Sequence, residues 1–242
     1  MKFSVIIPAY NEEKYLPRLL DSIEVAKANY SGGAEAVEVI VADNNSTDNT
    51  AEVAASRGAR VVRVEKRRIA AARNGAARAA RGEILCFIDA DSAVHPQTFD
   101  TIDRAMKTNR YVWGVTGAVL ERKSFALMVT YCLAMPMVLL TGLDTGLSFC
   151  RREDFEAVGG YDENRLYAED VILPLALRRL GRARGQRTTR LPQVKALGCT
   201  RKFDQFGDWH YFWMFGHAFK SLVTRNWHDE KLAERYWYNS GR

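Results

Sequence analysis

The feature that most constrains the fold of this chain is a repeated alternation of short apolar runs with segments of helical periodicity. The apolar runs lie at residues 3–8, 37–42, 59–64 and 84–88. Helical patterns follow at residues 15–23, 47–57 and 69–81, and begin again near Pro96. Because the runs are apolar at successive positions, they are typical of strands buried on both faces. We therefore predict an α/β fold with a Rossmann-like, mostly parallel sheet flanked by helices, in which ligands bind beyond the carboxyl ends of the strands.

The pattern becomes irregular in the second half of the 242-residue chain. We expect a strand over residues 112–120, a glycine-rich segment at 141–148, a helix over 169–180 and an aromatic tail at 209–215. We find neither a linker nor an internal repeat. We therefore predict one domain over residues 1–205, composed of the halves 1–111 and 112–205, and a helical extension over 206–242. Asn11 is the expected N-cap of the first helix.

Residues 125–143 form an apolar stretch of nineteen residues without a charge, which is the length at which a membrane span is considered. Pro136 and Gly142 interrupt it, and a single crossing would place the acidic motifs before and after it in different compartments. We therefore reject a simple span. A buried helix and a helix lying against a lipid surface both remain open.

The distribution of charges and cysteines gives further information on the kind of protein. The formal net charge is +6, and the excess comes from residues 57–82 and 178–202, each with nine Lys or Arg. The four cysteines form no C-x-x-C pair. We therefore interpret them as reduced thiols of a cytoplasmic protein, and expect neither a disulfide framework nor a zinc site. The apolar run at residues 3–9 is too short for a signal peptide and is followed by two glutamates.

Two carboxylates follow the fourth predicted strand, in the sequence Asp89-Ala90-Asp91. Carboxylate oxygens suit Mg²⁺ or Mn²⁺, whose other positions are filled by substrate phosphates. Helix capping is the alternative for an isolated pair of this kind. The buried strand before the pair places it at the ligand edge of the sheet, and this favours the metal site.

Further polar residues follow the first and second predicted strands. Tyr10, Asn11 and Glu12 follow the first, and Asp43, Asn44 and Asn45 follow the second. Asp43 is able to accept an N–H from a nucleobase, and the Tyr10 ring offers a flat face for stacking. Packing by the tyrosine and turn formation by the Asp-Asn segment are the simpler alternatives.

Phosphates, if bound, need cations here, because neither a G-x-x-x-x-G-K-[ST] loop nor a G-x-G-x-x-G loop is present. Arg73 precedes the D-x-D strand, and Arg201 and Lys202 occur near the end of the predicted domain. Glu169 and Asp170 open a helical pattern, where they are either helix-capping acids or a general base. Gly160 allows a close backbone approach to a ligand.

In combination, these motifs resemble family 2 glycosyltransferases, which have the GT-A fold. The resemblance spans about residues 3–205 and includes motifs at residues 5–13, 41–48, 72–75, 89–91, 159–162 and 169–170, in the family's order. It implies transfer of a sugar from a nucleoside diphosphate donor, a UDP-sugar above all, to an acceptor hydroxyl, with inversion and with Mn²⁺ or Mg²⁺. The Q-x-x-R-W motif of processive synthases is absent, so a single-sugar transfer is expected.

The resemblance also implies roles for individual residues. Tyr10 and Asp43 would hold the base, Asp89 the ribose and Asp91 the metal, and Asp170, next to Glu169, would be the general base. The remaining expected site residues are Pro8, Glu12, Arg73 and Ala90 for the donor nucleotide, Arg201 and Lys202 for the diphosphate, and Gly146, Gly160 and Tyr161 on the acceptor side. Residues 1–111 are then the nucleotide-binding half and 112–205 the acceptor-binding half.

Three further expectations stay open at this stage. The aromatic tail and residues 125–143 either bind a lipid-linked acceptor at the inner face of a membrane or close the core, and a homodimer contact is a further alternative. A sugar nucleotidyltransferase is the second enzymatic hypothesis, although such enzymes begin with a glycine-rich basic signature where this chain has Tyr-Asn-Glu-Glu. A basic nucleic-acid-binding protein is the third, and it leaves the acidic motifs unexplained. We expect no nucleic-acid partner.

Overall fold

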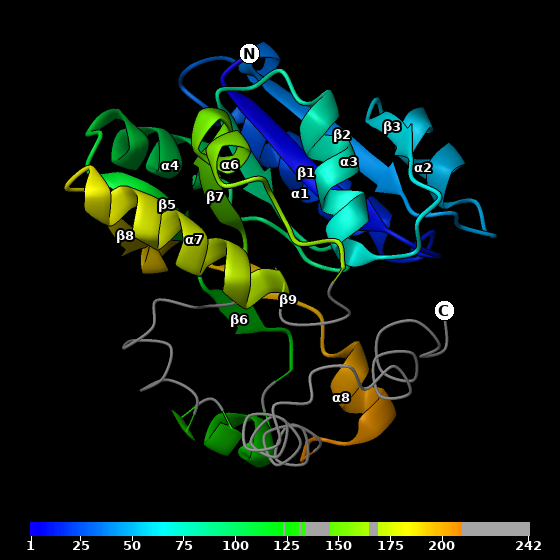
Figure 1. Ribbon diagram of the computed structural model, residues 1–242. Helices are drawn as coiled ribbons and strands as arrows, with labels where there is room; N and C mark the ends of the chain where they lie inside the picture. The colour runs from blue at the N-terminus through cyan, green and yellow to red at the C-terminus, as the bar shows by residue number, and fades with distance from the viewer. Residues whose placement is uncertain (123, 131, 134–145, 165–168, 210–242) are drawn as a thin grey trace.

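The computed structural model describes residues 1–122, 124–130, 132–133, 146–164 and 169–209 (Figure 1). The described residues form a seven-stranded sheet, a two-stranded sheet and the helices packed on them. The predicted α/β class is confirmed.

The main sheet has the strand order β3-β2-β1-β4-β7-β5-β8, in which β7 is antiparallel to both of its neighbours and the other described pairs are parallel. Its strands are β1 (Phe3–Ala9), β2 (Val37–Asp43), β3 (Arg60–Arg63), β4 (Ile84–Phe87), β5 (Tyr111–Val115), β7 (Ser148–Arg151) and β8 (Arg187–Arg190). All seven residues of β2 and all four of β4 are buried, as expected for strands covered on both faces. The predicted mostly parallel sheet is therefore confirmed.

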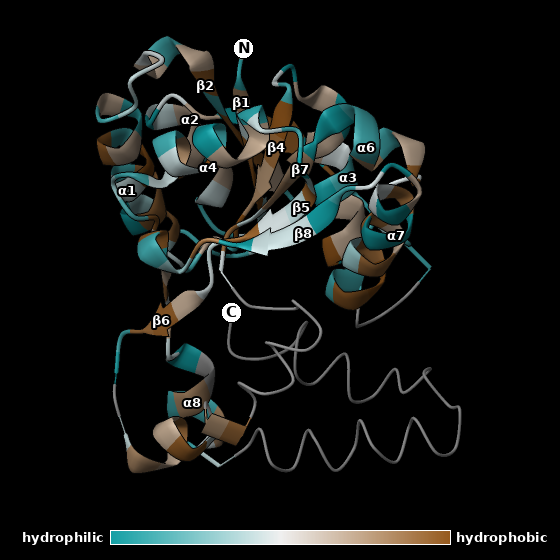
Figure 2. Ribbon diagram, turned by 90° about the vertical axis from the view of Figure 1, so that its left-hand side faces the viewer, coloured by the Kyte–Doolittle hydropathy of each residue, from teal (hydrophilic) through white to brown (hydrophobic). Residues whose placement is uncertain are grey.

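Helices cover both faces of this sheet, with the apolar strands between them (Figure 2). One face packs against α1 (Leu16–Ala28), α2 (Thr50–Ser56) and α4 (Thr98–Lys107). The other face packs against α3 (Ile69–Ala79), α6 (Arg152–Ala157) and α7 (Glu169–Ala183). Short 3₁₀ turns occupy Ala34–Ala36 and Pro192–Val194. An apolar layer thus packs on each face of the sheet. Burial of apolar surface is the dominant favourable contribution to folding, so these two layers are the main source of the fold's stability.

Helix α3 lies close to the sheet because its inner face consists of small residues. Its buried residues include Ala70, Ala71, Ala72, Ala76 and Ala77. A Cβ atom at Gly75 would come within 2.6 Å of the Val64 side chain. This close approach brings the first turns of α3 to the carboxyl ends of β1, β2 and β4.

The chain leaves the main sheet after β5, so the single strand predicted over residues 112–120 is wrong. Thr116 and Gly117 separate β5 from β6 (Ala118–Leu120), and Gly117 has a φ of 73°. This φ is incompatible with the extended backbone of a strand, and glycine adopts it without strain. Strand β6 instead pairs in parallel with β9 (Ala196–Gly198) in the small sheet.

The expectation that Asn11 caps the first helix is also wrong. Helix α1 begins at Leu16 and its N-cap is Tyr15, without a side-chain cap. Asn11 has a φ of 52°, and its Oδ1 accepts the Thr47 N–H at 2.8 Å. The asparagine therefore joins the loop after β1 to the loop after β2.

The apolar stretch at 125–143 is described only at its start. Residues 125–130 are helical, which agrees with the expected helix, and residues 134–145 lie outside the described residues. In both views this short helix lies with α8 (Arg201–Phe206) on the side of β6 and β9 away from the main sheet (Figures 1 and 2). Among the described helices, we find none that is long and apolar enough to cross a membrane.

The predicted domain limits remain expectations. Residues 111 and 112 both lie in β5, so the main sheet includes strands from both expected halves. Helix α8 contains residues 205 and 206, and residues 210–242 lie outside the described residues, including most of the aromatic tail.

Candidate functional site

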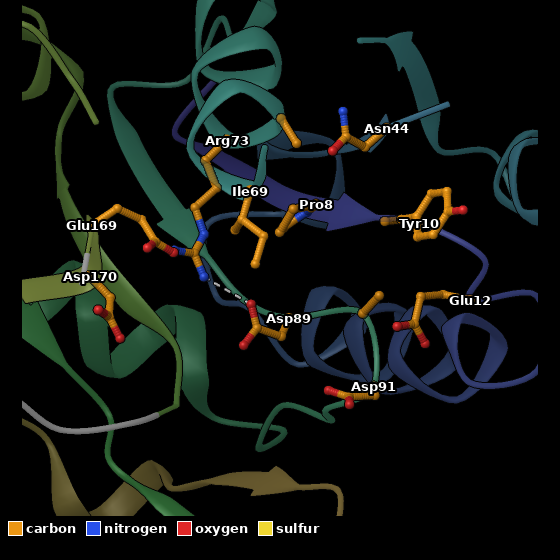
Figure 3. A pocket seen from close by; sticks show the side chains of 13 residues that line it. Pro8, Tyr10, Glu12, Asn44, Ile69, Arg73, Asp89, Asp91, Glu169 and Asp170 are labelled. Atoms are coloured by element: carbon orange, nitrogen blue, oxygen red, sulfur yellow. Dashed lines mark hydrogen bonds and ion pairs between the residues drawn. The ribbon is translucent and has the colours of Figure 1, made fainter. Parts of the chain in front are cut away.

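A pocket opens at the carboxyl ends of β1, β2 and β4 (Figure 3). Its walls come from the loops after these strands, from the first turns of α3 and from the start of α7. The lining residues are Pro8, Ala9, Tyr10, Glu12, Asn44, Ile69, Ala72, Arg73, Asp89, Ala90, Asp91, Glu169 and Asp170. The sheet edge predicted to bind ligands thus contains a pocket, as expected for a parallel α/β sheet.

The D-x-D sequence places its two carboxylates on different partners. Ala90 is 3% exposed and packs in the core, so the flanking aspartates remain at the pocket surface. Asp89 Oδ1 accepts Arg73 Nη2 at 2.9 Å, and Asp91 Oδ2 accepts Arg201 Nη2 at 2.9 Å. The two acids therefore anchor two separate ion-pair clusters.

Arg73 forms the first cluster by joining the loop after β4 to α7. Besides Asp89, its guanidinium donates to Glu169 Oε1 at 3.3 Å and lies 5.2 Å from the Tyr161 ring centre. Burial lowers the pKa of Arg73, but the electrostatic effects of Tyr161, Asp89 and Glu169 outweigh burial and raise the pKa overall. Arg73 is thus a permanent cation in the wall of the pocket.

Glu169 and Asp170 open α7 on the opposite wall from Glu12 (Figure 3). Burial raises the pKa of Glu169, an effect that the nearby Arg73 charge opposes without reversing it. Asp170 is exposed and lines the pocket. The pair thus presents one largely buried acid tied to an arginine and one acid exposed at the pocket.

The second cluster consists of Glu12, Asp91 and Arg201. Arg201 donates to both carboxylate oxygens of Glu12 at 3.0 Å, and its guanidinium lies 4.6 Å from the Tyr15 ring centre. Burial lowers the pKa of Arg201, but the hydrogen bond and charge of Glu12 raise it overall. Sequence reasoning did not predict this pairing, because 189 residues separate Glu12 from Arg201.

Tyr10 and Asn44 line the pocket near the ends of β1 and β2. The Arg67 guanidinium lies 4.3 Å from the Tyr10 ring centre. Asn44 is fixed by two hydrogen bonds of 2.8 Å, from its Nδ2 to the carbonyls of Val64 and Lys66. Asp43 does not line the pocket: it is 5% exposed, and its Oδ1 accepts the Ser46 N–H at 3.1 Å.

The lining residues omitted from the expected site set are Ala9, Asn44, Ile69 and Ala72. For Asn44 the signal was present, since it directly follows Asp43 at a strand end. Ala72 directly precedes Arg73, and Ile69 lies one helical turn before it. Nothing in these two apolar residues distinguishes them from core residues.

Besides Asp43 and Arg201, which are not among the lining residues, four expected residues lie away from the pocket or outside the described residues. Gly160 and Tyr161 follow α6, and Asn74 Oδ1 accepts the Tyr161 N–H at 2.9 Å. Gly146 lies against Gly117, whose carbonyl oxygen would be 2.3 Å from an added Cβ. The side chain of Lys202 lies outside the described residues. None of these four is among the described lining residues, and their expected roles stay predictions.

The chemistry of the site fits a divalent cation that takes few protein ligands. Asp91 presents a carboxylate at the pocket, and Mg²⁺ commonly takes one or two carboxylates together with substrate phosphates and water. Across the described residues, no group of three or more His, Cys, Asp or Glu side chains is arranged to hold a metal. A cation here would therefore depend on the bound phosphates for its other ligands.

Comparison with known proteins identifies relatives for the first half of the chain. A family model described as glycosyl transferase family 2 matches residues 4–126. The chain is also 35% identical over 134 residues to the dolichyl-phosphate beta-glucosyltransferase of Drosophila melanogaster, a match that covers 51% of this chain and 41% of that protein. The chain therefore spans less than half the length of this curated relative.

Solved structures share the fold. The Staphylococcus aureus TarS fragment 1–349 in complex with UDP-GlcNAc matches with a TM-score of 0.64 and 22% identity, over 82% of this chain and 58% of that chain. The mannosyltransferase PcManGT from Pyrobaculum calidifontis in complex with GDP-Man and Mn²⁺ matches with a TM-score of 0.62 and 24% identity, over 81% and 56%. These likenesses agree with the predicted GT-A fold.

Proposed function

Because the chain belongs to glycosyl transferase family 2, we propose that it transfers a single sugar from a nucleoside diphosphate sugar to an acceptor hydroxyl. One observation carries the proposal: a single pocket contains the D-x-D carboxylates, the Arg73 cation and the Glu169-Asp170 pair, which Arg73 contacts through Glu169. The first two are suited to a diphosphate, and the third to activation of an attacking oxygen.

The proposed reaction assigns a task to each wall. Tyr10 and Asn44 hold the base, while Asp43 fixes the turn after β2 through the Ser46 N–H, and Asp89 holds the ribose. A divalent cation held by Asp91 would neutralise charge on the diphosphate as it leaves. The acceptor oxygen attacks the anomeric carbon from the Asp170 side while the bond to the diphosphate breaks. Asp170 takes the hydroxyl proton. Because the attack is a single displacement on the face opposite the leaving diphosphate, the reaction inverts the anomeric centre.

We propose a UDP-sugar as the donor and Mn²⁺ or Mg²⁺ as the cation. Support comes from the fold relatives, since TarS was determined with UDP-GlcNAc and PcManGT with GDP-Man and Mn²⁺. The test is the thermal shift produced by UDP, GDP, dTDP and CMP with and without Mn²⁺, because a ligand that binds the native state raises its melting temperature. A metal-dependent shift with UDP alone is expected; equal shifts with all four nucleotides would contradict the assignment.

Two variants separate donor binding from chemistry. Asp91→Asn should abolish the metal-dependent part of UDP binding, because an amide is a poorer ligand for a hard cation. Asp170→Asn should leave UDP binding intact and remove transfer, because the base is lost. Release of free UDP identifies glycosyl transfer, whereas release of pyrophosphate would indicate nucleotidyl transfer. Equal UDP affinity in the wild type and Asp91→Asn would contradict the metal assignment.

For the acceptor, we propose a lipid-linked molecule reached at a membrane surface. Apolar side chains are exposed near α8 and residues 125–133: Phe125 is 75% exposed, Met128 62%, Leu133 60% and Trp209 54%. The named substrate class of the Drosophila relative, a dolichyl phosphate, agrees with this. Sedimentation with phospholipid vesicles tests it, and the variant Phe125→Ser/Met128→Ser should remain in the supernatant. Equal sedimentation of variant and wild type would contradict the proposal.

A further inference from the structure

The Arg201 guanidinium lies between the carboxylates of Glu12 and Asp91, which Figure 3 shows on the same side of the pocket. We propose that Arg201 is a positioning residue for Asp91, anchored by Glu12, and that it acts on cation binding through Asp91 without contacting the diphosphate. The inference rests on the proposed function, since the cation and the diphosphate belong to that function.

Glu12 is the fixed end of the cluster. Its side chain is 4% exposed, its N–H donates to Thr50 Oγ1 at 2.7 Å, and its carbonyl accepts the Leu16 N–H at 2.9 Å where α1 begins. The paired 3.0 Å contacts with Arg201 have the bidentate geometry that makes arginine–carboxylate pairs strong. Moving Arg201 onto a diphosphate would remove this partner from a buried carboxylate, which is costly.

Arg201 is also held from the side. The Tyr15 ring lies 4.6 Å from the guanidinium, an arrangement that favours a cation over an aromatic face. The Asp91 backbone has its own anchor, because Arg18 Nη2 donates to the Asp91 carbonyl at 2.5 Å. Backbone and side chain of Asp91 are thus fixed by two different arginines.

The charges of the cluster suit a cation site. Two carboxylates and one guanidinium sum to a formal charge of −1, so Glu12 offsets the charge that Arg201 would otherwise direct against a metal ion at Asp91. A carboxylate has about four lone-pair sites, so a hydrogen bond from Arg201 is compatible with cation binding by the same group. Hydrogen-bonded partners of this kind orient metal-ligating carboxylates.

The test compares UDP affinity in Mn²⁺ with UDP affinity in EDTA, measured by calorimetry on the whole chain. The dissociation constant in EDTA divided by the dissociation constant in Mn²⁺ reports how much the cation strengthens UDP binding. In Arg201→Gln, the ratio should fall by about tenfold or more, as is typical when a residue that orients a metal ligand is lost. The dissociation constant in EDTA should stay within about twofold of the wild-type value. Thermal melts establish that each variant is folded.

Glu12→Gln supplies the independent variant. It should lower the ratio as Arg201→Gln does, and the double variant should lose no more than either single one, because the two residues act as a unit. The matched control is Arg57→Gln, which removes an arginine paired with an exposed Asp21 outside the pocket lining. The control should retain the wild-type ratio.

Two results would overturn the inference while leaving the proposed function in place. One is an Arg201→Gln variant whose affinity weakens equally in Mn²⁺ and in EDTA, which is the signature of a direct diphosphate contact. The other is a Glu12→Gln variant with an unchanged ratio. A wild-type protein that binds no nucleoside diphosphate in either condition would instead overturn the proposed function and this inference together.

Discussion

Asn74→Asp tests whether the loop before the Glu169-Asp170 pair is held by a single side chain of α3. Asn74 is 7% exposed and makes three hydrogen bonds. Its Oδ1 accepts the Tyr161 N–H at 2.9 Å, and its Nδ2 donates to the Tyr161 carbonyl at 2.8 Å and to Glu163 Oε1 at 2.9 Å. An aspartate has the same shape and keeps the accepted bond, but it loses both donated bonds and places a carboxylate beside Glu163.

The expected cost follows from the two lost bonds. A neutral hydrogen bond contributes about 1 kcal/mol to stability, and one to a charged group about 1.5–3 kcal/mol. The variant should therefore lose roughly 3 kcal/mol of unfolding free energy at pH 7. For a domain of this size, that corresponds to a melting temperature lower by about 6–12 °C. Urea unfolding measures the difference, provided the slope of free energy against urea is unchanged.

The pH dependence gives the prediction a second readout. The hydrogen bond from Asn74 is the largest cause of a lowered pKa at Glu163. A lowered carboxyl pKa stabilises the fold above the unfolded-state pKa, and the effect is lost as the pH falls through the folded-state pKa. The penalty of Asn74→Asp should therefore shrink as the pH falls from 7 towards about 4, where both carboxylates begin to protonate.

The control is Asn164→Asp, which adds the same charge at an exposed position in the loop that Asn74 contacts. It should change the free energy of unfolding by less than about 0.5 kcal/mol, which is the usual range for substitutions at the protein surface. The reasoning is refuted if Asn74→Asp costs less than about 1 kcal/mol at pH 7, or if its cost does not depend on pH.

Two further predictions concern stability. In the wild type, the raised pKa of Glu169 means that the folded state binds this proton more tightly than the unfolded state, so stability falls as the pH rises from about 4.3 through the folded-state pKa. Glu169→Gln removes that fall, and urea unfolding at pH 4 to 7 should show the variant gaining on the wild type; parallel curves would contradict the assignment. Gly82→Ala places a Cβ 2.5 Å from the Phe3 carbonyl carbon, so it should cost about 1–3 kcal/mol. The control Gly159→Ala meets nothing within 4 Å of its Cβ and reports only the strain of a φ of 81°. Equal melting temperatures for Gly82→Ala and the wild type would rule out the overpacking.

The first half of the fold was predictable because its signals are local. Buried parallel strands such as β2 and β4 are continuous apolar runs, and the helices between them have clear periodicity. Strands β7 and β8 were not predicted. β8 reads Arg-Thr-Thr-Arg, which has no apolar pattern, and it forms a strand only because β5, more than 70 residues earlier in the sequence, provides its partner.

The residues of the candidate site were likewise predictable from local sequence, but the contacts between them were not. Asp89, Asp91, Glu169 and Asp170 were expected at the pocket because each lies at the end of a strand or the start of a helix. The Arg73 bridge and the Arg201–Glu12 pair depend on contacts between elements distant in the sequence, which residue spacing does not encode.

The excursion from the main sheet after β5 begins and ends at neighbouring positions. Thr116 N–H donates to the Leu147 carbonyl at 2.9 Å, and Leu147 N–H donates to Thr116 Oγ1 at 3.1 Å, so the two ends of the excursion are tied together. Because these ends directly follow β5 and precede β7, a change within the excursion need not alter the register of these two strands. Substitutions in the described part of this excursion, at residues 121–122 and 124–130, are therefore expected to leave the pairing of β5 with β7 unchanged.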